Sequence, residues 1–299
     1  KSIECKNLYG SELNGVCKVV NDCTGAALIG NCPESQICCI NDPGVVPKLT
    51  DNLINKNLFI KLVGNTTRNQ FLYPFIIESI TRAGVSIKDN FYGRAAFLSQ
   101  LVDESDYFKK LESGFFDSDN DNILGNNQSG DGKKYQGRGG ILLRGKNNYA
   151  LANASIRDLG YDIIKNPERV AFPSVAFKIA SWIWQNSYLL KDKEDPKKGS
   201  LNELVDGTFH SFTLLTHSLT NNLEYLTNRA KFNDLVLDEL KYSTMKRGQG
   251  INCQLNEEKG YSVPICLLDF KRSYCGCEGK FSKQTCPYGY NAQGKCRNS

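Results

Sequence analysis

The stretch AAFLSQLVDESDYF, residues 95–108, indicates the fold class, because its apolar side chains recur at intervals of three and four residues. The same spacing recurs in FLYPFIIESITRAG from residue 71, VAFKIASWIWQNSYLL from residue 175 and KFNDLVLDELKY from residue 231. A single apolar face on each segment is typical of helices that pack around a core. The sequence therefore predicts a mainly α-helical domain over residues 49–245.

The first of these helices carries an acid on its apolar side. A helix is expected from Arg94 to about Phe108, and a turn of about 100° per residue places Glu104 in line with Phe97, Leu101 and Phe108. A carboxyl beside an apolar stripe is partly desolvated, which raises its pKa toward the range where it can donate a proton. Glu104 is therefore the candidate general acid. The alternative is a glutamate that reaches from the edge of the stripe into water.

Hydrolysis of a glycosidic bond with inversion needs a second carboxylate, about 6.5 to 9.5 Å away, to activate water. The chain after Glu104 offers Glu112, Asp117, Asp119 and Asp121. Spacing alone does not choose among them, because acids in a loop usually form solvated surface.

A polar segment, residues 117–148, separates two of the predicted helices. It is rich in Gly, Asn and Asp, which predicts loops with a short hairpin rather than a long helix. Such an insertion is a natural place for a binding groove, and the alternative is a disordered surface loop.

The twelve cysteines occur only in the two terminal segments. Even numbers at each end predict disulfide frameworks in an oxidising compartment, and hence a secreted, extracellular protein. Zinc is disfavoured because neither cluster contains a CxxC pair or a histidine. The pairing stays open, because six cysteines allow fifteen connectivities. The two groups of six are Cys5, Cys17, Cys23, Cys32, Cys38 and Cys39, and Cys253, Cys266, Cys275, Cys277, Cys286 and Cys296.

These features predict four parts of the chain. Residues 1–42 form a disulfide-rich module, in which GVCKVVNDCTGAALIGNCPESQICC resembles the small clip-like modules attached to secreted hydrolases. Residues 43–48, with two prolines and a glycine, form a linker. The helical domain follows over residues 49–245, and residues 246–299 form a second disulfide-rich module.

The central domain resembles glycoside hydrolase family 19, the chitinases and lysozyme-like endolysins. AAFLSQLVDES resembles the family's helix that ends in His-Glu-Ser/Thr, and LGNNQSGDGKKYQGRGGILLRGKNNY resembles its GDG…GRG signature. VAFPSVAFKIASWIWQNS is similar to its helix with a Trp-rich face, and the resemblance spans roughly residues 70–229. It implies a lysozyme-like helical fold with a loop and short-hairpin insertion.

The resemblance also implies site residues. Glu104 matches the catalytic proton donor, and Asp119 falls where the second acid, normally glutamate, is expected. The side chains implied to bind substrate are Tyr135, Arg138, Arg144, Asn148, Tyr149 and Trp184.

Four positions depart from the family pattern. The histidine before the acid is Asp103, a glutamine is Leu142, the Thr or Ser that positions water is Arg144, and a later asparagine is Thr220. An isobutyl group or a bulky cation cannot make the hydrogen bonds of the groups they replace.

Three interpretations follow. In the first, the protein hydrolyses a β-1,4-linked N-acetylglucosamine polymer with Glu104 and Asp119. In the second, it cleaves peptidoglycan with Glu104 alone, and a substrate group replaces the base. In the third, it binds such polysaccharides without turnover, as a lectin-like or structural protein.

We expect a polysaccharide partner, no cofactor, no metal and a monomer. No apolar run reaches about 18 residues, so no membrane partner is expected. The net charge of +5 is interspersed, so no nucleic acid is expected.

The sequence also contains three glycosylation sequons and two histidines. Sequons at Asn65, Asn127 and Asn153 agree with export through a glycosylating pathway. His210 and His217 lack a nearby serine or cysteine motif, so they are interpreted as surface or packing residues.

Overall fold

The computed structural model divides into two compact units, residues 1–89 with 100–185 and residues 90–99 with 186–299. The predicted C-terminal module, residues 246–299, lies outside the described residues, as do the side chains of both histidines. The structure describes residues 3–8, 13–49, 54–85, 90–191, 199–220 and 225–245, without the side chains of residues 188–191, 210, 214 and 217.

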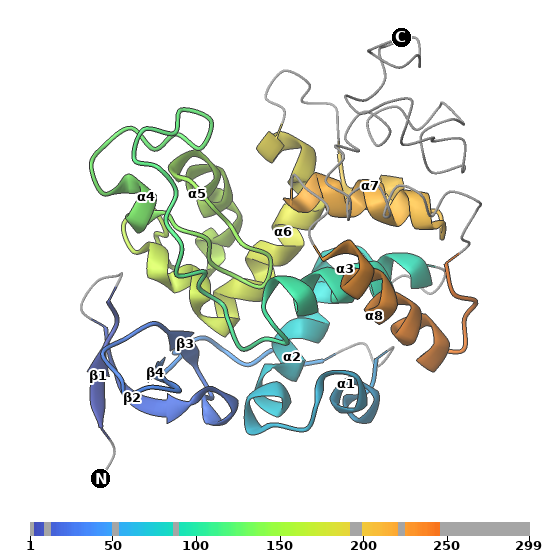
Figure 1. Ribbon diagram of the computed structural model, residues 1–299, viewed down its shortest axis with the longest axis horizontal. Helices are drawn as coiled ribbons and strands as arrows, with labels where there is room; N and C mark the ends of the chain where they lie inside the picture. Colours follow the sequence, from blue (N-terminus) through green and yellow to red (C-terminus); the bar gives the residue numbers. More distant parts are fainter. Residues whose placement is uncertain are drawn as a thin grey trace, which may run out of the picture. The chain divides into compact units, whose positions relative to one another are not determined.

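The N-terminal segment forms an antiparallel sheet of four short strands in the order β1-β2-β4-β3, drawn in blue in Figure 1. Three disulfides, Cys5–Cys38, Cys17–Cys32 and Cys23–Cys39, tie the strands together and confirm the predicted disulfide-rich module. They also assign the connectivity that spacing left open. The elements are β1 (Glu4–Lys6), β2 (Asn14–Val19), η1 (Val20–Asp22), β3 (Ala26–Leu28) and β4 (Gln36–Ile40).

The rest of the first unit is helical, with helix ends set by local capping. The side chain of Asn55 accepts a hydrogen bond from Leu58 N at the start of α1, and Thr66 does the same for Asn69 N at the start of α2. The elements are α1 (Lys56–Val63), α2 (Thr67–Arg82), α4 (Asp131–Lys134), α5 (Lys146–Asn153), η2 (Ala154–Leu159), η3 (Pro167–Ala171) and α6 (Pro173–Lys191), whose last turns belong to the second unit.

Helix α3 (Phe91–Glu104) has residues in both units, and the second unit adds η4 (Leu201–Leu204), α7 (Phe209–Thr220) and α8 (Leu226–Glu239). In this unit α7 packs against η4 and α8. Thr220, where the resemblance implies an asparagine, ends α7 and donates from its hydroxyl to Thr216 O at 2.9 Å.

Buried aromatic side chains join the helices of the first unit. Phe108, which is fully buried, stacks on Phe59 of α1 with ring centroids 5.9 Å apart and meets Phe177 of α6 edge-on at 6.0 Å. Aromatic pairs at these separations contribute beyond the area that they bury. The chain just after α3 is thereby anchored in the core.

The predicted mainly helical fold and the disulfide-rich N-terminal module are therefore confirmed, and the structure shows that this module is an antiparallel β-sheet. The end predicted for the helix that carries Glu104 is wrong: the helix ends at Glu104 itself, not near Phe108. Within the described part of the chain, no helix combines the length and apolar character needed to cross a membrane.

Candidate functional site

Glu104 is the last residue of α3 and is half-buried. The side chains predicted to share its stripe, Phe97, Leu101 and Phe108, are fully buried. Glu104 therefore lies at the boundary between the core and solvent.

A left-handed turn follows Glu104 and explains why the helix stops there. Asp106, Tyr107 and Phe108 have φ angles of 47°, 55° and 65°. Tyr107 N donates to Val102 O at 2.8 Å and Asp106 N donates to Asp103 O at 3.2 Å, the hydrogen bonds of a Schellman motif. Asp106 occupies the position where glycine is usual. Left-handed backbone costs about 1–2 kcal/mol per L-residue, so three such residues in succession require support from their surroundings.

That support comes from a buried arginine that the sequence did not single out. Arg68 of α2 is 1% exposed, and its Nε donates to Phe108 O at 2.7 Å. Its Nη1 donates to Cys23 O and Gly25 O, both at 3.0 Å. Burial lowers the pKa of Arg68 to about 10. A signal was present, because Arg68 lies four residues before Leu72 on the apolar face of α2.

The segment after the turn, residues 109–113, runs antiparallel to residues 137–139. Ser113 N donates to Gly137 O at 2.9 Å, and Gly139 N donates to Leu111 O at 3.0 Å. Residues 105–113, which comprise the left-handed turn and this segment, are called the strap below. Within the strap, Glu112 forms an isolated antiparallel β-bridge with Arg138.

Glu112 and Arg138 form a buried ion pair, with the Oε1 to Nε distance 2.9 Å and side chains 1% and 0% exposed. Gln136 Nε2 also donates to Glu112 Oε1 at 3.2 Å, and Ile29 N donates to Glu112 Oε2 at 3.1 Å. Both carboxylate oxygens thus accept from protein donors, and the side chain is shielded from solvent. Glu112 is a structural carboxylate here and is not placed to take a proton from a solvent water.

Arg138 also donates to the hydroxyl of Tyr149 at 3.2 Å, and that hydroxyl donates to Gln136 O at 2.8 Å. Burial alone would lower the pKa of Arg138, but Tyr149 and Glu112 outweigh it and raise that pKa above its ordinary value. Burial, the largest cause, raises the pKa of Tyr149 to about 12. Both groups therefore keep their charge states at physiological pH and hold the GRG segment in place.

The signature loop, residues 117–132, is held by carboxylates that accept backbone hydrogen bonds. Asp119 accepts from Gly130 N at 2.9 Å and from Gly132 N at 2.7 Å, at the start of α4. A Cβ on Gly132 would lie 1.8 Å from Asp117 O, and Gly130 has a φ of 88°, so both glycines of GDG are required by geometry. Asp121 similarly accepts from Ile123 N at 3.0 Å.

Asp131, the acid of GDG, joins this loop to α5. It is 5% exposed, and its Oδ2 accepts from Asn127 N, Gln128 N and Lys146 Nζ, each at 3.1 Å. Burial acts to raise the pKa of Asp131, but Lys146 and the two backbone N–H groups outweigh it and lower the pKa. The ionised carboxylate is therefore favoured in the folded protein and stabilises the loop.

Asp117 differs from the other loop acids. Its Oδ1 lies 3.3 Å from Arg144 Nη2, and its Oδ2 is buried with no hydrogen-bond partner in the protein. The side chain of Arg144 is 50% exposed, and that of Asp117 is 16% exposed. Arg144 therefore stands at the surface where the resemblance places a hydroxyl.

Four of the residues expected to contact substrate are buried inside the protein. Tyr135 is 2% exposed, and Arg138, Tyr149 and Trp184 are 0% exposed, so these side chains offer no surface to a polysaccharide. Tyr135 instead donates to Ile164 O at 3.3 Å, so its hydroxyl serves packing.

The other two expected contacts lie at the surface. Arg144 is exposed, and half-buried Asn148 donates from its amide to Arg144 O at 2.8 Å. These two side chains therefore stay available to a ligand.

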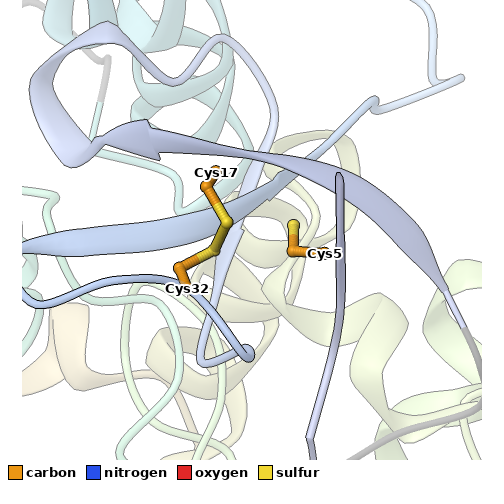
Figure 2. Close-up of side chains that lie close together, drawn as sticks. All are labelled: Cys5, Cys17 and Cys32. Atoms are coloured by element: carbon orange, nitrogen blue, oxygen red, sulfur yellow. A yellow bond between two sulfur atoms is a disulfide. The ribbon is translucent and has the colours of Figure 1, made fainter. Parts of the chain in front are cut away.

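The sulfur atoms of Cys5, Cys17 and Cys32 lie within 4.8 Å of one another, a spacing compatible with a metal. Figure 2 shows, however, that Cys17 and Cys32 are joined by a disulfide, and Cys5 is bonded to Cys38. Metals bind thiolates, so two neighbouring disulfides, rather than a metal site, account for this cluster.

Comparison with known proteins shows which protein family part of the chain resembles. Residues 108–209 match the glycoside hydrolase family 19 description, chitinase class I. An endochitinase from Persea americana is 30% identical over 123 residues, covering 37% of this chain and 34% of that protein. An endochitinase from Arabidopsis thaliana is 27% identical over 182 residues, covering 58% of this chain and 60% of that protein. The chain thus contains a segment homologous to family 19 chitinases.

Solved structures of chitinases also align with the chain. Chitinase C from Streptomyces griseus HUT6037 gives a TM-score of 0.48 at 18% identity, covering 67% of this chain and 98% of that chain. The class IV chitinase from Zea mays gives 0.45 at 15% identity, covering 64% and 94%. Among curated relatives, the chain spans 34% of the Persea americana protein and 19% of Chitinase 5 from Oryza sativa subsp. japonica.

Proposed function

We propose that the protein is a secreted glycoside hydrolase that cleaves a β-1,4-linked N-acetylglucosamine polysaccharide, either chitin or peptidoglycan, with Glu104 as the general acid. The Glu104 carboxyl donates its proton to the glycosidic oxygen as the bond to the anomeric carbon breaks. Water then adds to that carbon and gives its proton to a base.

One observation carries the proposal: a half-buried glutamate ends α3, and a left-handed turn, held by a buried arginine, follows it directly. Strained backbone beside a partly desolvated carboxyl is typical of catalytic sites, because a proton donor must be held in a defined place. The family match covers residues 108–209, which include Asp119 and the GRG segment but not Glu104, so the assignment of Glu104 rests on its place in the structure and on the resemblance of its helix.

The second carboxylate in the proposal is Asp119, whose position in the signature loop the resemblance implies. Its two backbone hydrogen bonds leave each oxygen a further lone pair for a water. Asp117 is the competitor, because one of its oxygens has no protein partner. Asp119→Asn and Asp117→Asn distinguish them: the base variant loses turnover, and the other loses at most loop stability.

A binding function without turnover is the second candidate, and a specific feature favours it. Arg144 replaces the hydroxyl that would position water, and its exposed guanidinium is paired with Asp117. An arginine in this place can bind a sugar or a carboxylate of peptidoglycan, but it cannot replace a hydroxyl as a water ligand.

Secretion is part of the proposal because three disulfides persist only in an oxidising compartment. Two sequon asparagines, Asn65 and Asn127, are exposed and accessible to glycosylation. Asn127 belongs to the signature loop, so a glycan there would stand beside the site.

Release of reducing ends from chitin and from bacterial walls tests the proposal. We expect the parent protein to release them from one of the two polymers, and Glu104→Gln to abolish release. Glu78→Gln is the matched control, because Glu78 is also a half-buried helical glutamate of the first unit. Sedimentation with the polymer but no release would instead favour the binding function.

A further inference from the structure

The N-terminal disulfide module contacts the strap through buried polar groups. Arg68 bonds Cys23 O and Gly25 O of the module on one side and Phe108 O of the strap on the other. Ile29 N of the module donates to Glu112 Oε2 of the strap at 3.1 Å. The module therefore meets the strap at both ends of residues 108–112.

The module is also joined to the start of α6. Asp42 Oδ2 accepts from Ser174 N at 2.7 Å, and Asp42 Oδ1 accepts from Ser174 Oγ at 2.8 Å. A carboxylate at a helix N-terminus satisfies a free N–H group and interacts favourably with the helix dipole. A Cβ on Gly44 would lie 2.2 Å from Ser174 Cβ, so the chain that leaves the module also lies close against this helix.

These contacts place the module inside the scaffold of the first unit. Arg68 is 1% exposed and Glu112 is 4% exposed, so their partners in the module are needed to satisfy buried charged groups. If the module were attached only through the linker and made no contact with the helical part, Arg68 and Glu112 would face water instead.

We infer that the disulfide module is a positioning element of the candidate site, with Arg68 as the positioning residue that transmits its rigidity to the turn after Glu104. The inference rests on the proposed function for its effect on turnover, but not for its effect on the strap. In the left-handed turn, Phe108 O must point to Arg68. Cys23 and Gly25 fix the guanidinium, and the Cys23–Cys39 disulfide fixes Cys23.

Removal of one disulfide at a time tests the inference in the full chain. The first variant is Cys23→Ala with Cys39→Ala, which frees the carbonyls that hold Arg68. The matched control is Cys17→Ala with Cys32→Ala. The two disulfides close loops of similar length, with separations of 16 and 15 residues, so their effects on the unfolded chain are similar.

Hydrogen exchange of the strap amides, read by mass spectrometry on residues 105–112, is the primary measurement. We expect exchange at least about tenfold faster in the Cys23/Cys39 variant and little change in the control. Of the two disulfides, only Cys23–Cys39 includes a residue whose carbonyl accepts a hydrogen bond from Arg68. Equal exchange in both variants, or no change in either, would overturn the inference.

Arg68→Lys is a second variant in case the disulfide variant does not fold. Lysine keeps the charge but cannot donate to Phe108 O and to the module at once, so faster strap exchange is again expected, and exchange equal to that of the parent would contradict the inference. Where the parent hydrolyses polysaccharide, kcat should fall about tenfold or more in Arg68→Lys, with KM little changed. If the parent has no hydrolytic activity, the proposed function fails, and strap exchange still decides this inference.

Discussion

The strap, residues 105–113, and the signature loop, residues 117–132, both follow Glu104 but are held by different means. The strap depends on buried charges, Arg68 and the Glu112–Arg138 pair, and on left-handed backbone. The signature loop depends on half-buried carboxylates that accept backbone N–H groups and on glycines. The strap therefore relies on charges paired inside the protein, whereas the loop relies on carboxylates that accept backbone N–H groups, among them buried Asp131 and half-buried Asp119.

The largest expected effect comes from breaking the buried pair of the strap. Glu112→Gln leaves Arg138 buried without its counter-ion, which should lower the free energy of unfolding by about 3–5 kcal/mol. Denaturant unfolding of the parent and the variant measures this. A loss below about 1 kcal/mol would mean that Arg138 finds another partner and that the strap is not the scaffold described.

The signature loop should respond less, and its response should depend on pH. Asp131→Asn removes the charge that accepts from Lys146 and two backbone N–H groups, which should cost about 1–3 kcal/mol at neutral pH. The pKa of Asp131 is lowered on folding from its ordinary value of 3.8. Its contribution is therefore present above pH 4 and is lost as pH falls through the folded pKa.

Thermal unfolding between pH 2 and pH 7 measures this dependence. The parent should lose stability more steeply than Asp131→Asn as the pH falls below about 4, so the two curves should converge in acid. Parallel curves over the whole range would contradict the role given to this charge.

The smallest expected effect is a gain in stability. Asp106→Gly relieves the left-handed backbone at the Schellman position, which should stabilise the protein by about 0.5–1 kcal/mol. The lost ion pairs of Asp106 with Lys109 and Lys110, at 3.8 and 3.7 Å on the surface, contribute little. Denaturant unfolding again measures the change, and destabilisation would show that the Asp106 side chain itself holds the turn.

Sequence periodicity predicted the helices and the place of Glu104, because an apolar stripe reports directly on which face is buried. It missed the end of α3, because three non-glycine residues with positive φ carry no local signal. The family resemblance implied that Trp184 and Tyr149 contact substrate, whereas both are fully buried. Aromatic residues suit a sugar ring and a core equally well, so residue type could not separate these roles.

The disulfide pairs and the contacts of Arg68 could not be predicted for a different reason. Both join segments far apart in the chain, such as Cys23 and Arg68, whose meeting depends on how the module packs. The cysteine count predicted that a stapled module exists, but not that its carbonyl groups support the turn beyond Glu104.

The most direct test of the central claim is a single-turnover cleavage of a soluble N-acetylglucosamine oligomer with enzyme in excess, by the parent and by Glu104→Gln. Excess enzyme separates binding from bond cleavage. We expect the variant to bind the oligomer as the parent does but to cleave it about 10²–10⁴-fold more slowly. Cleavage by Glu104→Gln at the parent's rate would contradict the claim that Glu104 donates the proton.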